Sequence, residues 1–425
     1  MSSRKTRMPW RRWIFLALVA SLGVASVVLT MSGPRRPSAP SAARATDRAG
    51  EAGAAAGSGV AIAAPEAPEP ATVEPPPYFL AWTPGGLPLD FRAQVRTVPG
   101  IGSAVVVAGD TRWLTRSLAA GGDVIDDPRA PFAIPIDAFA VNPVEVAPFL
   151  PAGVRGDVVD ALARGQGVLG TRSALVRRLG VGGALEFEER SVRIGAVVPE
   201  ELIGWSELLV SREVGAGLGI VDDRYLWAFL DEERSLGAFE QLIRPLVPEK
   251  EPLRVEGPGD SPYMRVANGV NPPVVLKRAF DEFAAALDPA NPASFRIDPA
   301  WIHANLVTRS VPLLGRLTCH RRFMEDLVRA MRRVEREGLG PLIHSTAGCF
   351  NARTVGHSPT NPPSFHAYGA AVDINAPENA LGAVPTMDRR VVAIFEDLGF
   401  NWGGDFLIPD GMHFEYGGDL LAGGP

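Results

Sequence analysis

SFHAYGAAVD at residues 364–373 and DGMHFE at residues 410–415 decide the fold of the C-terminal part of this chain. In the first stretch, Gly369 permits a turn between His366 and a short strand that carries Asp373. Side chains alternate along a strand, so Asp373 can point into a cleft while its apolar neighbours enter the core. The first stretch therefore predicts a turn that brings an imidazole and a carboxylate together.

The second stretch adds a second imidazole to the same cleft. On a strand, His413 and Glu415 share a face, and Gly411 supplies a bend that brings Asp410 back toward that face. Two imidazoles and a carboxylate can hold zinc with one position open for a water, which the metal acidifies. Asp410 could take the proton of that water. The predicted ligands are His366, Asp373 and His413; cobalt or manganese also suits such a donor set.

Composition limits the architecture and the partners. A chain of 425 residues predicts two or three domains, and 46% apolar with 21% charged residues is typical of a globular protein. The net charge of -6 gives no reason to expect nucleic acid as a partner.

The N-terminal segment, residues 1–32, predicts a membrane anchor. Basic residues precede the uncharged stretch 13–31, which is long enough to cross a bilayer and places the rest of the chain outside the cytoplasm. A cleaved signal peptide is the alternative, and it would make the protein secreted. The Ala- and Pro-rich residues 33–77 predict an extended linker.

Residues 78–246 predict a separate α+β domain outside the cytoplasm. Short apolar runs alternate with Gly and Pro turns, and a helix–strand–helix pattern over 157–179 precedes two strands at 184–188 and 192–198. This range contains no histidine, which favours a positioning or partner-binding role over a second active site. Residues 247–271 are predicted as a second linker.

Residues 272–425 predict the domain that carries the two motifs. Apolar residues at helical spacing predict one helix over 321–337, ended by Gly338, and a second helix after Asp388. Both helices should pack against a small sheet. Cys319 and Cys349 are the two cysteines of the chain; they can form a disulfide outside the cytoplasm or remain buried thiols.

The two motifs together resemble a known enzyme family. Ser-x-His-x-x-Gly-x-Ala-x-Asp, starting at Ser364, and Asp-x-x-His-Phe-Glu, starting at Asp410, resemble the zinc D-alanyl-D-alanine carboxypeptidases and L-alanyl-D-glutamate endopeptidases, which cut peptidoglycan stem peptides. The likeness runs from Trp301 to Tyr416. It implies a compact, hedgehog-like fold with a small antiparallel sheet and packed helices.

The resemblance also implies roles for single residues. His366, Asp373 and His413 correspond to the zinc ligands, and Asp410 corresponds to the general base. Two further residues correspond to substrate-binding positions. Arg353 would hold a carboxylate of the stem peptide, and Ser364 would support either the metal ligands or the substrate. Carboxypeptidase members often carry Glu at the position of Asp410, so the aspartate favours endopeptidase cleavage.

The middle region has a second resemblance and leaves other functions open. Gly165 to Gly170, the turn at 179–182 and the later residues 218–220 resemble the extracytoplasmic core domain of macrolide-exporter-type ABC permeases. This likeness implies an envelope or ABC-transporter partner. One alternative is that the C-terminal domain binds or senses peptidoglycan stems without cutting them. Another alternative is that the middle region carries the principal function by contacting its partner, and that the peptidase acts as its effector.

Overall fold

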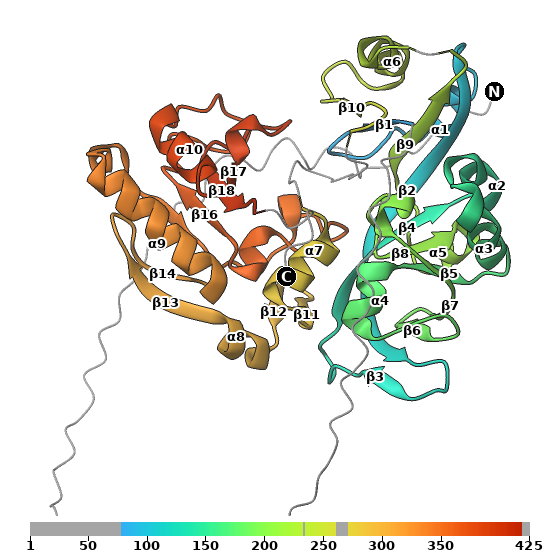
Figure 1. The fold of residues 1–425 in the computed structure, drawn as a ribbon, viewed down its shortest axis with the longest axis horizontal. Coiled ribbons are helices and arrows are strands. Elements are labelled where there is room, and N and C mark those ends of the chain that lie inside the picture. The colour runs from blue at the N-terminus through green and yellow to red at the C-terminus, as the bar shows by residue number, and fades with distance from the viewer. Residues whose placement is uncertain (1–77, 233, 261–270, 419–425) are drawn as a thin grey trace, which may run out of the picture. The chain divides into compact units, whose positions relative to one another are not determined.

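The computed structural model describes residues 78–232, 234–260 and 271–418. The predicted membrane anchor at 1–32 and the linker at 33–77 lie outside the described residues. Within the described ranges, no helix is both long enough and apolar enough to cross a membrane. The predicted mixed α+β architecture is confirmed, and so is the small antiparallel sheet at the C-terminal end (Figure 1).

A ten-stranded mixed sheet dominates residues 78–260, which we call the sheet region. Its strands are β1 (Phe79–Trp82), β2 (Ile101–Leu118), β3 (Val124–Asp126), β4 (Ile134–Val141), β5 (Gly167–Gly170), β6 (Ala184–Phe187), β7 (Ser191–Val198), β8 (Leu208–Ser211), β9 (Asp223–Leu230) and β10 (Arg254–Glu256). They pair in the order β10-β1-β9-β2-β4-β8-β5-β7-β6, and β3 pairs with β2. β2 also pairs with β6, so the strands β2-β4-β8-β5-β7-β6 form a closed ring.

Short helices cover this sheet. They are α1 (Phe91–Val95), α2 (Pro143–Val146), α3 (Ala152–Ala163), α4 (Thr171–Arg177), α5 (Arg212–Gly217) and α6 (Leu236–Ile243), with 3-10 turns at Ala147–Phe149, Glu200–Ile203 and Arg244–Leu246. The helix–strand–helix pattern expected over 157–179 is confirmed as α3, β5 and α4, and the two strands that follow are β6 and β7.

The range 247–271, predicted as a linker, differs from the expectation at one point. Residues 254–256 form β10, which pairs antiparallel with β1 at the edge of the large sheet. A three-residue edge strand with charged ends shows too little alternation to be recognised in the sequence. Residues 257–260 are also described, whereas 261–270 lie outside the described residues.

Residues 271–418, which we call the motif region, contain three smaller sheets. Their strands are β11 (Ala285–Asp288), β12 (Asn291–Ile297), β13 (Leu306–Val311), β14 (Gly315–His320), β15 (Thr346–Gly348), β16 (Ala371–Ile374), β17 (Phe400–Trp402) and β18 (His413–Tyr416). The first four form two hairpins, β11-β12 and β13-β14. The last four form one antiparallel sheet in the order β15-β16-β18-β17.

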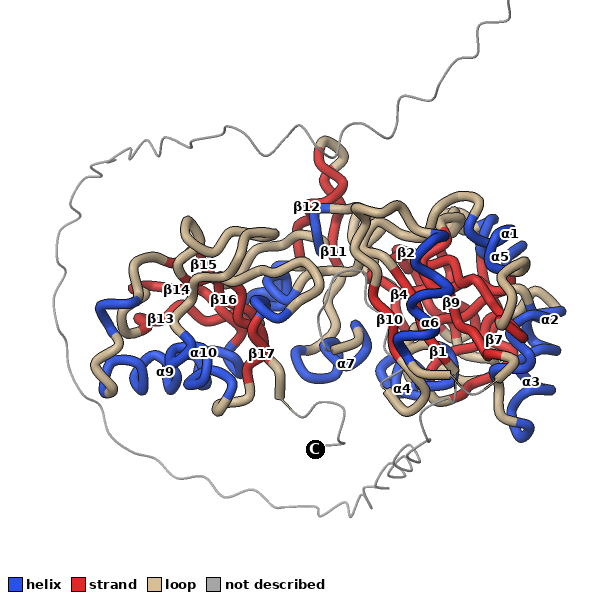
Figure 2. Tube along the Cα trace, turned by 90° about the horizontal axis from the view of Figure 1, so that it is seen from above, coloured by secondary structure: helices blue, strands red, loops and turns tan. Residues whose placement is uncertain are grey.

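The helices of this region are α7 (Pro273–Phe280), α8 (Pro299–Asn305), α9 (Arg321–Arg336) and α10 (Arg389–Glu396), with 3-10 turns at Gly340–Leu342, Val355–His357, Phe365–Tyr368 and Gly403–Asp405. α10 packs against β17 of the four-stranded sheet, and α9 packs against α10 and, through Phe323 and Phe400, reaches the same strand. Figure 2 shows α9 and α10 side by side along the strands of this region. The predicted helices at 321–337 and after Asp388 are confirmed: α9 buries its apolar side, and the Asp388 side chain caps α10 by accepting from the backbone N of Arg390.

The two regions have separate apolar cores that meet at α7. One cluster of buried side chains lies within the motif region, and three others lie mainly within the sheet region. Val274 and Val275 of α7 pack against Trp205 of the sheet region. On the same helix, buried Lys277 donates to both carboxylate oxygens of Glu207, at 2.7 and 2.9 Å. A buried ion pair of this kind fixes one register between the surfaces that it joins.

Candidate metal centre

Backbone geometry brings the three predicted ligands together. His366 lies in the 3-10 turn Phe365–Tyr368, which ends at Gly369 with a φ of 65°. A Cβ at Gly369 would stand 2.6 Å from the backbone N of His320, so glycine is required both for the turn and for the close approach. Asp373 of β16 then pairs directly with His413 of β18 in the antiparallel register.

The three side chains form one compact donor set. The Nε2 of His366 lies 3.2 Å from Oδ1 of Asp373, and Nδ1 of His413 lies 3.1 Å from the same oxygen. The two ring nitrogens are 3.2 Å apart. All three residues are buried, and their donor atoms lie within 4.8 Å of one another. Such a cluster of nitrogen and oxygen donors can surround a single metal ion.

Each imidazole is oriented by a second partner on its other nitrogen. Nδ1 of His366 donates to the carbonyl O of Cys349 at 2.7 Å, which leaves Nε2 as the nitrogen that could bind a metal ion. Nε2 of His413 lies 3.1 Å from Oε2 of Glu415, which leaves Nδ1 for the metal. Metal-binding histidines commonly have such partners, which fix the tautomer and the ring orientation.

These orienting groups were not assigned from the sequence. Strand alternation predicted that His413 and Glu415 share a face, and the 3.1 Å contact confirms it. The spacing of two residues was therefore the available signal for the role of Glu415. The carbonyl of Cys349 had no comparable signal, because a backbone acceptor is brought into place by the path of the whole chain.

The two cysteines lie beside the site and are joined. Cys319 of β14 and Cys349 form a disulfide with their Cα atoms 5.5 Å apart, and both are buried. The sequence had left this pairing open. The cross-link holds Cys349 against the β13-β14 hairpin, and Cys349 supplies the carbonyl that orients His366.

The electrostatics of the cluster favour a cation. Burial raises the pKa of Asp373, but its hydrogen bonds with His366 and His413 outweigh burial and lower the pKa well below its usual value. Burial lowers the pKa of His413, whereas Asp373 and Glu415 raise it, to about 10 overall. The carboxylates therefore attract positive charge to this point. The donor set, its burial and its oriented rings fit a zinc ion.

Asp410 lies on the turn that leads into β18. Its backbone N donates to the O of Gly403 at 2.8 Å, and its own O accepts from the N of His413 at 3.0 Å. Burial raises the pKa of the Asp410 carboxyl, and Asp373 acts in the same direction, while the histidines and Arg353 oppose it. Its buried Oδ1 makes no hydrogen bond within the described part of the chain.

Gly411 lies in the turn between Asp410 and His413, as the sequence suggested. It is not among the glycines with positive φ, so the bend does not require the left-handed conformation. A Cβ there would stand 2.9 Å from the Cβ of Pro385 and 3.0 Å from Oδ1 of Asn379. Glycine is therefore required by the close approach of the neighbouring loop, which helps to place Asp410 near the ligands.

Arg353 and Ser364 lie together at the edge of the cluster. The backbone N of Ser364 donates to the O of Arg353 at 3.0 Å. Burial lowers the pKa of the Arg353 guanidinium, while the charges of Asp373 and Asp410 act in the opposite direction. The buried Oγ of Ser364 makes no hydrogen bond within the described residues. The Nη1 of Arg353 donates to the carbonyl O of Thr354 at 3.3 Å.

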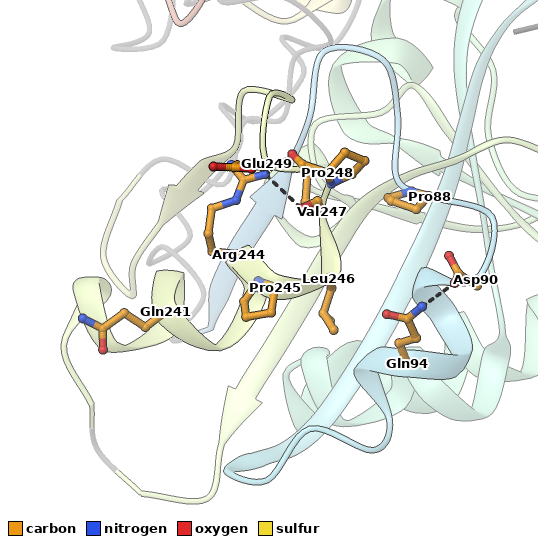
Figure 3. Close-up of a pocket in the computed structure, with 10 residues that line it drawn as sticks. All are labelled: Pro88, Asp90, Gln94, Gln241, Arg244, Pro245, Leu246, Val247, Pro248 and Glu249. Carbon is orange, nitrogen blue, oxygen red and sulfur yellow. Dashed lines mark hydrogen bonds between the residues drawn. The ribbon is translucent and has the colours of Figure 1, made fainter.

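A separate hollow lies in the sheet region, away from these residues (Figure 3). It has a volume of about 740 Å³ and is lined by residues of α1 and just before it, by Gln241 of α6 and by residues 244–249, which follow α6. Its arginine, Arg244, is committed to backbone carbonyls of residues 247, 248 and 251. The hollow offers no set of groups comparable to the cluster in the motif region.

Comparison with known protein families agrees with the motifs. Residues 358–416 match the model of a family described as D-alanyl-D-alanine carboxypeptidase. This range includes the three candidate ligands, Ser364 and Asp410, and it begins after Arg353. The resemblance expected for the C-terminal part is therefore confirmed. No curated protein matches the chain.

Solved structures similar to this chain include domains of membrane transporters. The periplasmic region of MacB from Actinobacillus actinomycetemcomitans has 12% sequence identity and a TM-score of 0.29, covering 43% of this chain and 90% of that one. The extracellular domain of the noncanonic ABC-type transporter YknZ from Gram-positive bacteria has 14% identity and a TM-score of 0.28, covering 42% and 99%. A likeness of this degree carries no conclusion about activity.

Proposed function

We propose that this chain is a zinc-dependent peptidase that hydrolyses peptide bonds in peptidoglycan stem peptides. The observation that carries the proposal is the buried set of His366, Asp373 and His413, with donor atoms within 4.8 Å and with Asp410 close by. The family match over residues 358–416 supports the same reaction class. The peptidase domain is proposed to span 272–425, and the protein is proposed to act outside the cytoplasm, anchored through residues 1–32.

The three ligands and Asp410 have different roles in the proposed hydrolysis. When bound to the three ligands, zinc would supply a Lewis acid that acidifies a water and offsets charge on the scissile carbonyl oxygen. Asp410 accepts a proton from the attacking water through its unpartnered Oδ1 and returns it to the leaving amine. Burial raises the pKa of the Asp410 carboxyl, and a base is more effective when its pKa lies nearer the working pH.

Substrate binding falls to the groups at the edge of the cluster. Arg353 is proposed to hold a carboxylate of the stem with two charge-assisted hydrogen bonds, and the Oγ of Ser364 adds a neutral partner. Binding at this point would place the neighbouring amide beside Asp410. The bond proposed is either the terminal D-alanyl-D-alanine bond or the L-alanyl-D-glutamate bond, with Asp410 favouring the second.

Digestion of purified peptidoglycan by the full-length chain tests the proposal. Fragments released with and without a chelator are identified by mass, and Asp410→Asn is compared with the wild-type chain. Hydrolysis should require metal and fall on the order of 10²–10⁴-fold in the variant. Asp405→Asn, an exposed carboxylate on a nearby turn, serves as the matched control and should retain activity.

One outcome would overturn this function, and another would overturn the role of Asp410 as the base. If the zinc-loaded wild-type chain leaves peptidoglycan unchanged, the remaining functions are binding or sensing of stem peptides, or interaction with a transporter partner. Equal loss in Asp405→Asn and Asp410→Asn would show that the loop as a whole, rather than the base, was disturbed.

A further inference from the structure

A closed loop separates the two candidate substrate-binding residues. Thr354 and Pro363 form an antiparallel bridge, so residues 354–363, which we call the motif loop, return to their starting point. Arg353 and Ser364 stand immediately before and after this bridge, and their backbones are joined by a hydrogen bond of 3.0 Å. The backbone of Arg353 is also bridged to Ser294 of β12, so the motif loop is one of two supports that set the relative position of Arg353 and Ser364.

The sheet region holds the tip of the motif loop through Arg224 of β9. This arginine is 7% exposed, and its guanidinium donates to Oδ1 of Asn361 at 3.0 Å and to Oγ1 of Thr360 at 2.6 Å. Its Nε donates to the carbonyl O of Gly109 in β2 at 3.1 Å, which fixes the fork against the sheet. The backbone N of Thr111 also donates to the O of Thr360, at 3.0 Å.

Asn361 transmits this contact across the loop. Its Oδ1 accepts from Arg224, while its Nδ2 donates to the carbonyl O of Val355 on the opposite arm at 3.0 Å. The backbone N of Val355 in turn donates to the O of Pro362 at 2.9 Å. One guanidinium from a distant strand thus fastens both arms of the loop.

We propose that Arg224 is a positioning residue that sets Arg353 and Ser364 for the carboxylate of the stem peptide. This inference rests on the proposed function and extends it, because it makes the sheet region a part of substrate binding. Hydrogen bonds to a charged, buried donor are among the stronger ones in proteins, so their removal should loosen the motif loop first. The metal ligands are held by other contacts and should keep their geometry.

Amide exchange and kinetics on the full-length chain test the inference. In Arg224→Ala, exchange at residues 354–364 should rise on the order of tenfold or more. KM for a stem peptide with a free carboxylate should rise by a similar factor with a smaller change in kcat, and zinc content should not change. Asn361→Ala should show the same pattern more weakly. An amidated peptide, which lacks the carboxylate, should not distinguish either variant from the wild-type chain.

Arg212→Ala is the matched control. Arg212 is a partly buried arginine of the sheet region whose guanidinium contacts Asp223 at 2.6 Å and the carbonyl O of Val106, with no contact to the motif loop in the described structure. Its replacement should leave exchange at 354–364 unchanged. A similar increase in amide exchange at 354–364 in both arginine variants would show that Arg224 only stabilises the fold in general, and this would overturn the inference.

The proposed function and this inference can fail separately. If the wild-type chain binds zinc but does not hydrolyse stem peptides, the proposed function is wrong. Amide exchange at 354–364 and calorimetric binding of the stem peptide would still test the role of Arg224. A folded Arg224→Ala chain with wild-type exchange at 354–364 and wild-type peptide affinity removes the inference, whether or not hydrolysis occurs.

Discussion

Replacing Glu415 with Gln should weaken zinc binding without disturbing the ligands themselves. Glu415 is 1% exposed, and its Oε2 lies 3.1 Å from Nε2 of His413, the nitrogen that faces away from the donor set. Glutamine keeps the shape and one acceptor oxygen but removes the negative charge. A charge-assisted hydrogen bond is roughly twice as strong as a neutral one.

The expected magnitude follows from the position of Glu415 behind a ligand. Losing such a partner typically lowers metal affinity about 10–100-fold, which corresponds to about 1.4–2.7 kcal/mol. We expect Glu415→Gln to fall within this range, because the hydrogen bond survives in neutral form. A loss far above it would indicate that the variant has displaced His413 itself.

A chelator competition measures this loss. The full-length chain is titrated with zinc against a chromogenic chelator, and Glu378→Gln serves as the control. Glu378 forms the same kind of contact, at 3.2 Å from Nδ1 of His344, but on the surface and away from the donor set. Wild-type zinc affinity in Glu415→Gln, or an equal loss in both variants, would refute the role assigned to Glu415.

Two more predictions concern binding and stability. Arg353→Lys keeps the positive charge but loses the planar guanidinium that can form two parallel hydrogen bonds. KM for a stem peptide with a free carboxylate should therefore rise about tenfold, while KM for an amidated peptide should not change. An equal change with both peptides would contradict the proposal that Arg353 holds the carboxylate. Burial lowers the pKa of His320 from its ordinary 6.5 to about 4, so between these pH values the unfolded chain binds a proton that the folded chain does not. Stability should therefore fall as the pH drops from 6.5 toward 4, by up to about 3 kcal/mol, and His320→Asn should flatten this part of the profile in urea unfolding at pH 7 and 4.5.

The candidate ligands could be predicted because their geometry is mostly local. A glycine turn, a short strand and strand alternation place His366 and Asp373 within eight residues, and the second motif needed only one pairing between strands. What the sequence could not supply were partners set by the rest of the fold. The carbonyl of Cys349 reaches His366 through a disulfide whose formation depends on the distance between two separate segments.

The division of the chain into two folded regions stays a prediction from composition and periodicity. Buried side chains form separate clusters in the sheet region and the motif region, but contacts between the two regions had no signal in the sequence. The contact between Arg224 and Asn361 joins residues 137 positions apart, and no periodic pattern encodes such a pair. The buried Lys277 likewise reads as an ordinary basic residue near the end of a helix until Glu207 is placed beside it.

These long-range contacts divide the candidate site into two halves with different supports. The metal ligands depend on β16, β18, Cys349 and Glu415, all within the motif region. Arg353 and Ser364 flank the motif loop, whose tip is bonded to β2 and β9 of the sheet region, and Arg353 is also bridged to Ser294 of β12. A change near Arg224 should therefore alter substrate binding at constant zinc affinity, and a change at Glu415 should do the reverse. If each change altered both quantities equally, the two supports would not be independent, and the sheet region would have to be assigned to the metal centre as well.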